Sequence, residues 1–194
     1  MSRTVFLIIG PSGSGKTSLT QSLVERVPQL TKGTTVTTRV PRPGEVSGKD
    51  YHFVTPLQFS EMQRAGAFLE TDYAYNESYG VPRSTLEVEG DVALIVTVPG
   101  ALSLRRILPY AMTLFVMPAS AGTAAIRVSD RNSPNQAERI ASYESEVSAA
   151  RYFDSVFLNL DFEETVQEMV SVVLSRRRSM LFRPWCFAPA YHCD

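Results

Sequence analysis

The chain has 194 residues, enough for one domain with small insertions, and 44% of them are apolar against 20% charged, as in ordinary globular proteins. Its 19 basic and 20 acidic residues give a net charge of −1, which excludes a global attraction to nucleic acid or to an anionic membrane surface. The apolar run over residues 5–10 is too short for the core of a signal peptide or for a membrane span. We therefore expect a cytoplasmic protein.

Short apolar runs alternate with longer helical patterns along the chain, which predicts an α/β fold with a parallel sheet flanked by helices. The predicted strands cover residues 5–9, 92–98, 112–117 and 156–160. The predicted helices cover residues 17–27, 101–108 and 162–177, and prolines at 28 and 109 end the first two.

Residues 34–89 have a different character, with short β-like runs at 35–39, 51–54 and 68–73 and one short helix near 57–65. We interpret this stretch as an inserted, mostly β subdomain. A second insertion covers 120–151, where a polar, turn-rich segment at 130–135 is followed by a predicted helix over 136–151. Such an insertion is typical of a mobile lid.

Residues 10–17, Gly-Pro-Ser-Gly-Ser-Gly-Lys-Thr, match the motif GxxxxGK[ST] at every fixed position, between a predicted strand and a predicted helix. Glycines let successive N–H groups point at phosphate oxygens, and the helix N-terminus adds partial positive charge. Lys16 is predicted to reach the β- and γ-phosphates of ATP, and Thr17 to hold Mg²⁺. The predicted ATP-binding residues of this phosphate loop are Gly10, Pro11, Ser12, Gly13, Ser14, Gly15, Lys16 and Thr17.

The alternative, a glycine-rich turn without a ligand, is disfavoured by the strand–loop–helix context. The motif alone does not name the acceptor, because ATPases, GTPases and small-molecule kinases share it. No aspartate lies on the predicted strand at 93–98, so we expect Mg²⁺ to bind Thr17, nucleotide oxygens and water.

Several segments resemble, in order and spacing, the nucleoside-monophosphate-binding part of guanylate kinases: residues 35–45, 48–54 and 66–70, and the pair Tyr79-Gly80. The resemblance extends over residues 4–175. It implies a P-loop kinase that makes GDP from GMP with ATP and Mg²⁺, as a monomer or homodimer. Asn159 falls where the family has its adenine-edge asparagine, and three arginines fall where it has lid arginines: Arg127, Arg131 and Arg139.

The resemblance also implies an acceptor site formed by Thr35, Arg39, Arg42, Tyr51, Glu70 and Tyr79. Two arginines three residues apart and two phenols would form a donor-rich nest for a monophosphate. The Glu70 carboxylate could accept the N1–H and N2–H of guanine, a pairing that adenine cannot make, while Thr35 could donate to O6. The implied catalytic residues are Lys16, Arg39, Arg127, Arg131 and Arg139, which would neutralise charge on the transferring phosphoryl group.

Three positions depart from the family pattern. Guanylate kinases usually carry acidic residues where this chain has Ile95 and Thr97, and a serine or threonine where it has Val81. A related small-molecule kinase, ribose 1,5-bisphosphate phosphokinase, also lacks the acidic pair, although the intact Glu70 argues against it. A non-catalytic binding module is the third interpretation, but such modules typically lose the phosphate loop that this chain keeps.

The predicted organisation is therefore one guanylate kinase-like domain over 1–178. Its core comprises 1–33, 90–119 and 152–178, with an acceptor-binding subdomain over 34–89 and a lid over 120–151. The remaining residues, 179–194, form an aromatic tail that we expect to dock on the body or to be disordered. Cys186, His192 and Cys193 lie in this tail, where three crowded ligands favour a loose segment over a metal site.

Overall fold

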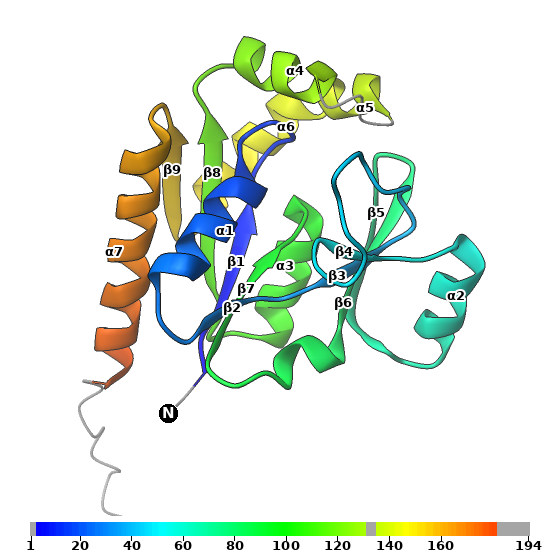
Figure 1. Ribbon diagram of the computed structural model, residues 1–194, viewed down its shortest axis with the longest axis horizontal. Helices are drawn as coiled ribbons and strands as arrows, with labels where there is room; N and C mark the ends of the chain where they lie inside the picture. The colour runs from blue at the N-terminus through cyan, green and yellow to red at the C-terminus, as the bar shows by residue number, and fades with distance from the viewer. Residues whose placement is uncertain (1–2, 131–134, 182–194) are drawn as a thin grey trace, which may run out of the picture.

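The computed structural model describes residues 3–130 and 135–181 and has two sheets with helices around them (Figure 1). The larger sheet contains five parallel strands in the order β2-β7-β1-β8-β9. Their bounds are β1 Val5–Ile9, β2 Leu30–Lys32, β7 Asp91–Ile95, β8 Met112–Pro118 and β9 Ser155–Asn159. This confirms the α/β fold with a parallel sheet that the sequence predicts. Within the described ranges, no helix is both long and apolar enough to span a membrane.

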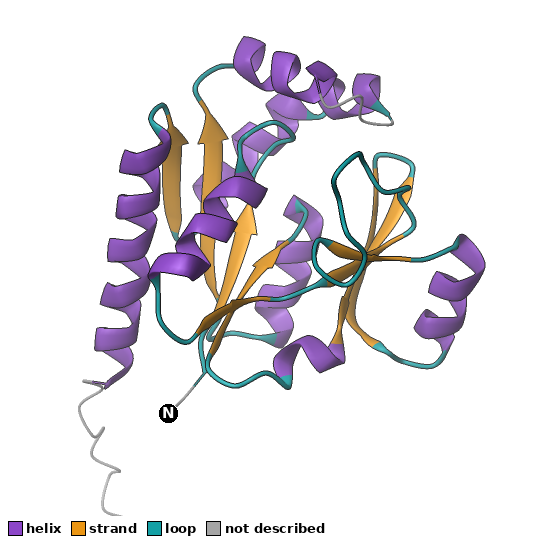
Figure 2. Cartoon of the chain, viewed as in Figure 1, coloured by secondary structure: helices purple, strands orange, loops and turns teal. Residues whose placement is uncertain are grey.

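The central strand β1 is completely buried because helices cover both faces of the sheet (Figure 2). Alternate residues of a strand point to opposite faces, so Leu7 joins one apolar cluster and Phe6 joins the other. Helices α1 (Lys16–Arg26) and α7 (Phe162–Leu181) pack on the side of Phe6, and α3 (Val98–Ile107) packs on the side of Leu7.

The smaller sheet is mixed and has the order β4-β3-β6-β5. Strands β3 (Thr35–Thr37) and β4 (Tyr51–Phe53) are parallel, whereas β6 (Glu77–Pro82) runs antiparallel to both β3 and β5 (Phe68–Ala74). Helix α2 (Pro56–Arg64) begins at a capping box and packs Phe59 against Phe68. In Figure 1 this sheet stands beside the larger one.

In its described part, residues 119–130 and 135–154, the connection from β8 to β9 contains three helices and one 3₁₀ turn: α4 (Ala121–Asp130), α5 (Gln136–Ala141), α6 (Tyr143–Ser148) and η2 (Ala149–Tyr152). Figure 1 shows α4 and α5 beyond the carboxyl ends of β1 and β8, over the loop that leads into α1. In parallel α/β sheets this is the edge where ligands bind. The division into core, acceptor-binding subdomain and lid stays a prediction, and below the word lid is only a name for helices α4, α5 and α6.

The predicted strand over 92–98 is wrong at its carboxyl end, because β7 stops at Ile95 and α3 begins at Val98. Thr97 lies between the two elements as the N-cap residue of α3. Its hydroxyl caps α3 by accepting from the Gly100 N–H at 3.1 Å, and Pro99 lies in the first turn.

The predicted helix over 136–151 is divided at Ser142 into α5 and α6. The Ser142 hydroxyl lies 3.2 Å from the Arg139 carbonyl oxygen and 2.7 Å from Glu146 Oε1, and it can donate its one hydrogen to either. Such local bonds compete with helix continuation. The sequence prediction also missed β2, β6 and α4, whose short or mixed patterns form elements only against their neighbours. Helix α7 continues to Leu181, past the predicted domain end at 178.

Candidate functional site

The phosphate loop is held in a conformation that only glycine adopts readily. Gly10, Gly13 and Gly15 have φ values of 142°, 82° and 95°. A Cβ at Gly10 would lie 2.1 Å from the Val116 carbonyl oxygen, and one at Gly13 would lie 2.5 Å from the Ala124 carbonyl oxygen. The loop is therefore packed against both β8 and α4.

Lys16 begins α1, and its side chain folds back over the loop. The ammonium donates to the carbonyl oxygens of Gly10 at 2.6 Å and Pro11 at 2.8 Å. Thr17 follows on the first turn and is exposed, and both residues line the pocket in front of the loop. The Lys16 ammonium and the Thr17 hydroxyl thus lie near the N-terminus of α1, which is the positive end of the helix dipole.

Asn159 supports the loop from the end of β9. Its side chain is 4% exposed, and its amide donates to the Ser14 carbonyl oxygen at 2.8 Å. A Cβ at Gly15 would lie 2.6 Å from the same amide nitrogen. This buried contact was not part of the sequence prediction, and the adenine-edge role of Asn159 stays a prediction.

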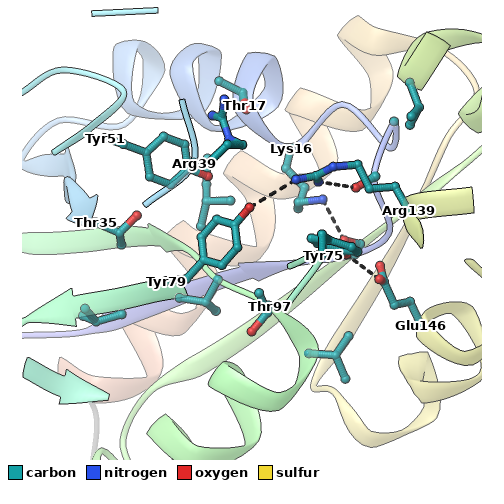
Figure 3. A pocket seen from close by; sticks show the side chains of 18 of the residues that line it. Lys16, Thr17, Thr35, Arg39, Tyr51, Tyr75, Tyr79, Thr97, Arg139 and Glu146 are labelled. Carbon is teal, nitrogen blue, oxygen red and sulfur yellow. Dashed lines mark hydrogen bonds between the residues drawn. The ribbon is translucent and has the colours of Figure 1, made fainter. Parts of the chain in front are cut away.

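A single pocket lies between the phosphate loop, the smaller sheet, the end of β7 and the lid (Figure 3). It brings together thirteen of the predicted site residues: Gly10, Ser12, Gly13, Gly15, Lys16, Thr17, Thr35, Arg39, Arg42, Tyr51, Glu70, Tyr79 and Arg139. Arg127 contacts the loop instead, donating to the Gly13 carbonyl oxygen at 3.2 Å. Arg131 lies outside the described residues, as do the tail residues Cys186, His192 and Cys193.

Arg39 is the most buried charge of the pocket, with 2% of its surface exposed. It donates to Glu45 Oε1 at 2.8 Å and stacks over the Tyr51 ring at 5.4 Å from the centroid. Burial alone would lower the pKa of Arg39, but the hydrogen bond and charge of Glu45 raise that pKa above its ordinary value. Glu45, which the sequence analysis did not assign, therefore holds this arginine charged and in place.

Arg42 lines the same pocket, but fewer hydrogen bonds and negative charges offset the burial of its guanidinium. Its Nε is buried and has no hydrogen-bond partner within the described part of the chain. Burial, followed by the positive charges of Arg39 and Arg139, lowers the pKa of Arg42 to about 10. Three guanidinium groups therefore converge here, and an anion between them would relieve their repulsion.

Arg139 reaches this space from helix α5 of the lid, as Figure 3 shows. It donates to Ser12 Oγ of the loop at 3.0 Å and to the Tyr79 hydroxyl oxygen of the smaller sheet at 3.1 Å. The guanidinium lies 4.1 Å from the centre of the Tyr75 ring, and the side chain is 7% exposed. One lid residue thus contacts both halves of the pocket.

The turn between β5 and β6 grips the lid through contacts that the sequence did not predict. Tyr75 and Asn76 have φ values of 54° and 60°, as a two-residue hairpin turn requires. The Tyr75 hydroxyl donates to Glu146, Asn76 donates to Glu138 at 3.1 Å, and Asn135 donates to the Tyr75 carbonyl oxygen at 2.5 Å. We call these contacts the hairpin–lid clasp. Its only sequence signal was the Tyr-Asn pair that follows the predicted β-like run at 68–73.

Glu70 also lines the pocket. Its carboxylate lies beside the start of α3, where a Cβ at Gly100 would lie 3.1 Å from Oε1. Burial, followed by repulsion from Asp72, raises the pKa of Glu70 to about 7. Thr35, Val81 and Ile95 line the pocket as well, so together with Glu70 they combine one carboxylate with a largely apolar wall.

Comparison with known proteins decides the family. A family model described as guanylate kinase matches residues 1–176. The chain belongs to the guanylate kinase family. It is 33% identical to a guanylate kinase of Wolbachia pipientis wMel over 93% of this chain and 94% of that protein. A guanylate kinase of Shewanella denitrificans is 35% identical over 89% of this chain and 87% of its own length.

The fold gives the same result. The crystal structure of guanylate kinase from Anaplasma phagocytophilum matches with a TM-score of 0.72 and 26% identity, covering 90% of this chain and 87% of that one. Guanylate kinases are nucleoside-monophosphate kinases, so the enzyme class predicted from the sequence is confirmed. The individual site roles stay predictions.

Proposed function

We propose that this protein transfers the terminal phosphoryl group of ATP to GMP, giving ADP and GDP. The observation that carries the proposal is the convergence of the phosphate loop, the Arg39–Arg42 pair and Glu70 in one pocket. A nucleotide with a phosphate at one end and paired N–H donors at the other matches this distribution of charge. The membership in the guanylate kinase family supports the same substrate pair.

In this proposal the phosphate loop and Lys16 bind the β- and γ-phosphates of ATP. Arg39 and Arg42 hold the phosphate of GMP so that one of its oxygens attacks the γ-phosphorus. That P–O bond forms while the bond from the γ-phosphorus to the bridging oxygen breaks, and ADP leaves with the electron pair. Arg139, bonded to both the loop and Tyr79, lies where it can neutralise charge on the transferring group.

The resemblance implies Mg²⁺ as the cofactor, and Thr17 fits the ion. Its exposed hydroxyl lies beside Lys16 on the pocket wall. In residues 3–130 and 135–181, no group of three or more His, Cys, Asp or Glu side chains could hold a metal. Mg²⁺ commonly keeps several waters and binds substrate phosphates, so few protein ligands suffice. When bound, the ion would neutralise charge on the β- and γ-phosphates.

The decisive experiment measures ADP release with ATP and Mg²⁺ across GMP, dGMP, IMP, AMP and ribose 1,5-bisphosphate. We expect the highest kcat/KM with GMP. A much higher value for the sugar bisphosphate would instead assign the protein to the related small-molecule kinases, which also lack acidic residues at positions 95 and 97. The cytoplasmic location and the choice between monomer and homodimer stay predictions.

A further inference from the structure

Tyr75, in the turn between β5 and β6, contacts two residues of α5 that lie one helical turn apart. Asn135, the N-cap residue of α5, donates to the Tyr75 carbonyl oxygen at 2.5 Å. Arg139 places its guanidinium carbon over the Tyr75 ring, 4.1 Å from the ring centre. Positions four residues apart share one face of a helix, so this face of α5 lies against Tyr75.

The Tyr75 side chain is itself held in place. Its backbone has a φ of 54° in the two-residue turn, and its hydroxyl donates to Glu146 of α6. Burial, followed by the charge and the hydrogen bond of Glu146, raises the pKa of Tyr75, so the hydroxyl stays protonated and remains a donor. The ring is therefore fixed between the smaller sheet and α6, and Figure 3 shows it in the pocket beside Arg139.

The ring contacts the face of the Arg139 guanidinium, while the edge of the guanidinium makes hydrogen bonds. Arg139 donates to Ser12 Oγ at 3.0 Å and to the Tyr79 hydroxyl oxygen at 3.1 Å. The N–H groups of a guanidinium lie in its plane, whereas an aromatic ring packs on its face, so the two kinds of contact do not compete. The ring thus limits the tilt of the guanidinium plane, and with it the direction of the N–H groups.

We propose that Tyr75 is a positioning residue whose ring holds the Arg139 guanidinium in the orientation that neutralises charge on the transferring phosphoryl group. This inference rests on the proposed function, because it concerns the part that Arg139 takes in phosphoryl transfer. It gives the ring a part separate from that of the hydroxyl, which belongs to the hairpin–lid clasp. A residue of the smaller sheet thus orients a charge that α5 supplies.

Two variants separate the ring from the hydroxyl. Tyr75→Phe keeps the ring and loses the hydroxyl, whereas Tyr75→Leu loses both. We expect kcat in Tyr75→Leu to be about threefold to thirtyfold lower than in Tyr75→Phe, with KM for GMP changed less than about twofold, because Arg139 acts on the transferring group. The matched control is Tyr73→Leu. Tyr73 is 68% exposed on the same hairpin and does not line the pocket, so kcat should not change.

An Arg139→Ala background tests whether the ring acts through Arg139. The rates are measured in single turnovers with enzyme in excess, so that slow transfer is resolved. In this background Tyr75→Phe and Tyr75→Leu should give rates within about twofold of each other, because the group that the ring orients is gone. A ring that only stabilised the hairpin would lower the rate by the same factor with and without Arg139.

A nuclear magnetic resonance signal of Arg139 reports on the contact without turnover. Protons over the face of an aromatic ring resonate upfield, because the ring current shields them. The side-chain Nε–H signal of Arg139, assigned from its absence in Arg139→Lys, should move downfield in Tyr75→Leu. It should keep its position in Tyr75→Phe and in the control Tyr73→Leu.

The inference is overturned if the Arg139 signal does not move in Tyr75→Leu, if Tyr75→Phe and Tyr75→Leu have equal kcat, or if their ratio is the same without Arg139. Tyr75→Asn also lacks the ring and suits the positive φ at this position, so it repeats the test if Tyr75→Leu does not fold. Signal and turnover separate the two proposals. A shifted signal in a protein that releases no ADP refutes the proposed function and supports the ring contact, whereas an active protein without the shift refutes only the inference.

Discussion

The phosphate loop and the acceptor pocket lie side by side but are built in opposite ways. The loop is a run of consecutive residues whose glycines have no room for a side chain. The acceptor pocket collects residues from β3, β4, β5, β6 and the lid. Each glycine of the loop is constrained by its own backbone, whereas the pocket depends on side chains that separate strands bring together.

Two carboxylates outside the pocket lining support residues that line it. The resemblance implies acidic residues where this chain has Ile95 and Thr97. Glu45 binds Arg39 at 2.8 Å from the turn after β3, and Asp72 accepts the Thr97 hydroxyl from β5. Replacements in the loop should therefore abolish function, whereas replacements in the pocket should change it by degrees.

The largest effect is expected at Lys16. Lys16→Ala removes the charge at the mouth of the loop and should lower kcat by about 10²–10³ or more, with the fold retained. Lys49→Ala, which changes an exposed lysine, is the control. ADP release and circular dichroism measure the two properties. Activity close to wild type in Lys16→Ala would contradict the proposed role of the loop.

Two glycine-to-alanine variants test whether packing constrains the phosphate loop more than the acceptor-binding segment. Gly13→Ala places a Cβ 2.5 Å from a backbone oxygen at φ 82°, and should cost about 2–6 kcal/mol of stability or displace the loop. Gly48→Ala has a similar φ of 85° but no atom within 4 Å, so it should cost only about 1–2 kcal/mol. Denaturant unfolding measures both. Equal losses would show that packing does not distinguish the two regions.

Glu70→Gln should lower kcat/KM for GMP about tenfold to a hundredfold, since an amide presents one acceptor where the carboxylate presents two. ADP release with GMP and with AMP is the measurement, and the effect should be confined to GMP. Similar kinetics for GMP in the two proteins would show that Glu70 does not contact the base.

The pH dependence should follow from the raised pKa of Glu70, about 7. Guanine donors need the ionised carboxylate, so kcat/KM for GMP should fall about tenfold as pH decreases from 8 to 6. Asp72 is the charged group that faces Glu70, and Asp72→Ala should move the inflection to lower pH. In Glu70→Gln the inflection from Glu70 should be absent from the pH profile, leaving only the titration of the GMP phosphate near pH 6. An inflection unchanged in Glu70→Gln would assign it elsewhere.

The smallest effect is expected at the hairpin–lid clasp. Tyr75→Phe removes the hydroxyl that donates to Glu146, and should lower kcat/KM about threefold to tenfold by favouring an open lid. Glu144→Gln changes an exposed carboxylate on the same helix and should have no effect. Steady-state kinetics with ATP and GMP provide the measurement. A wild-type kcat/KM in Tyr75→Phe would show that the clasp does not contribute to closure.

Local patterns predicted the features that depend on neighbouring residues. The phosphate loop, the five buried residues of β1 and the apolar face of α7 all follow from spacing along the chain. The short strand β2 and the polar strand β6 escaped prediction because they are stabilised by pairing with distant strands. The break at Ser142 escaped prediction because the residues around it have a helical pattern, and only the structure shows the local bonds of the Ser142 hydroxyl.

By itself the sequence determined the parallel sheet, the loop that starts α1 and the residue types of the acceptor site. The tertiary structure decided which of those residues meet. Thr97 contacts a carboxylate 25 positions away, and the tyrosine of the clasp contacts one 71 positions away. Such pairs have no periodicity to reveal them. They form only when sheet pairing and helix packing bring distant segments of the chain together.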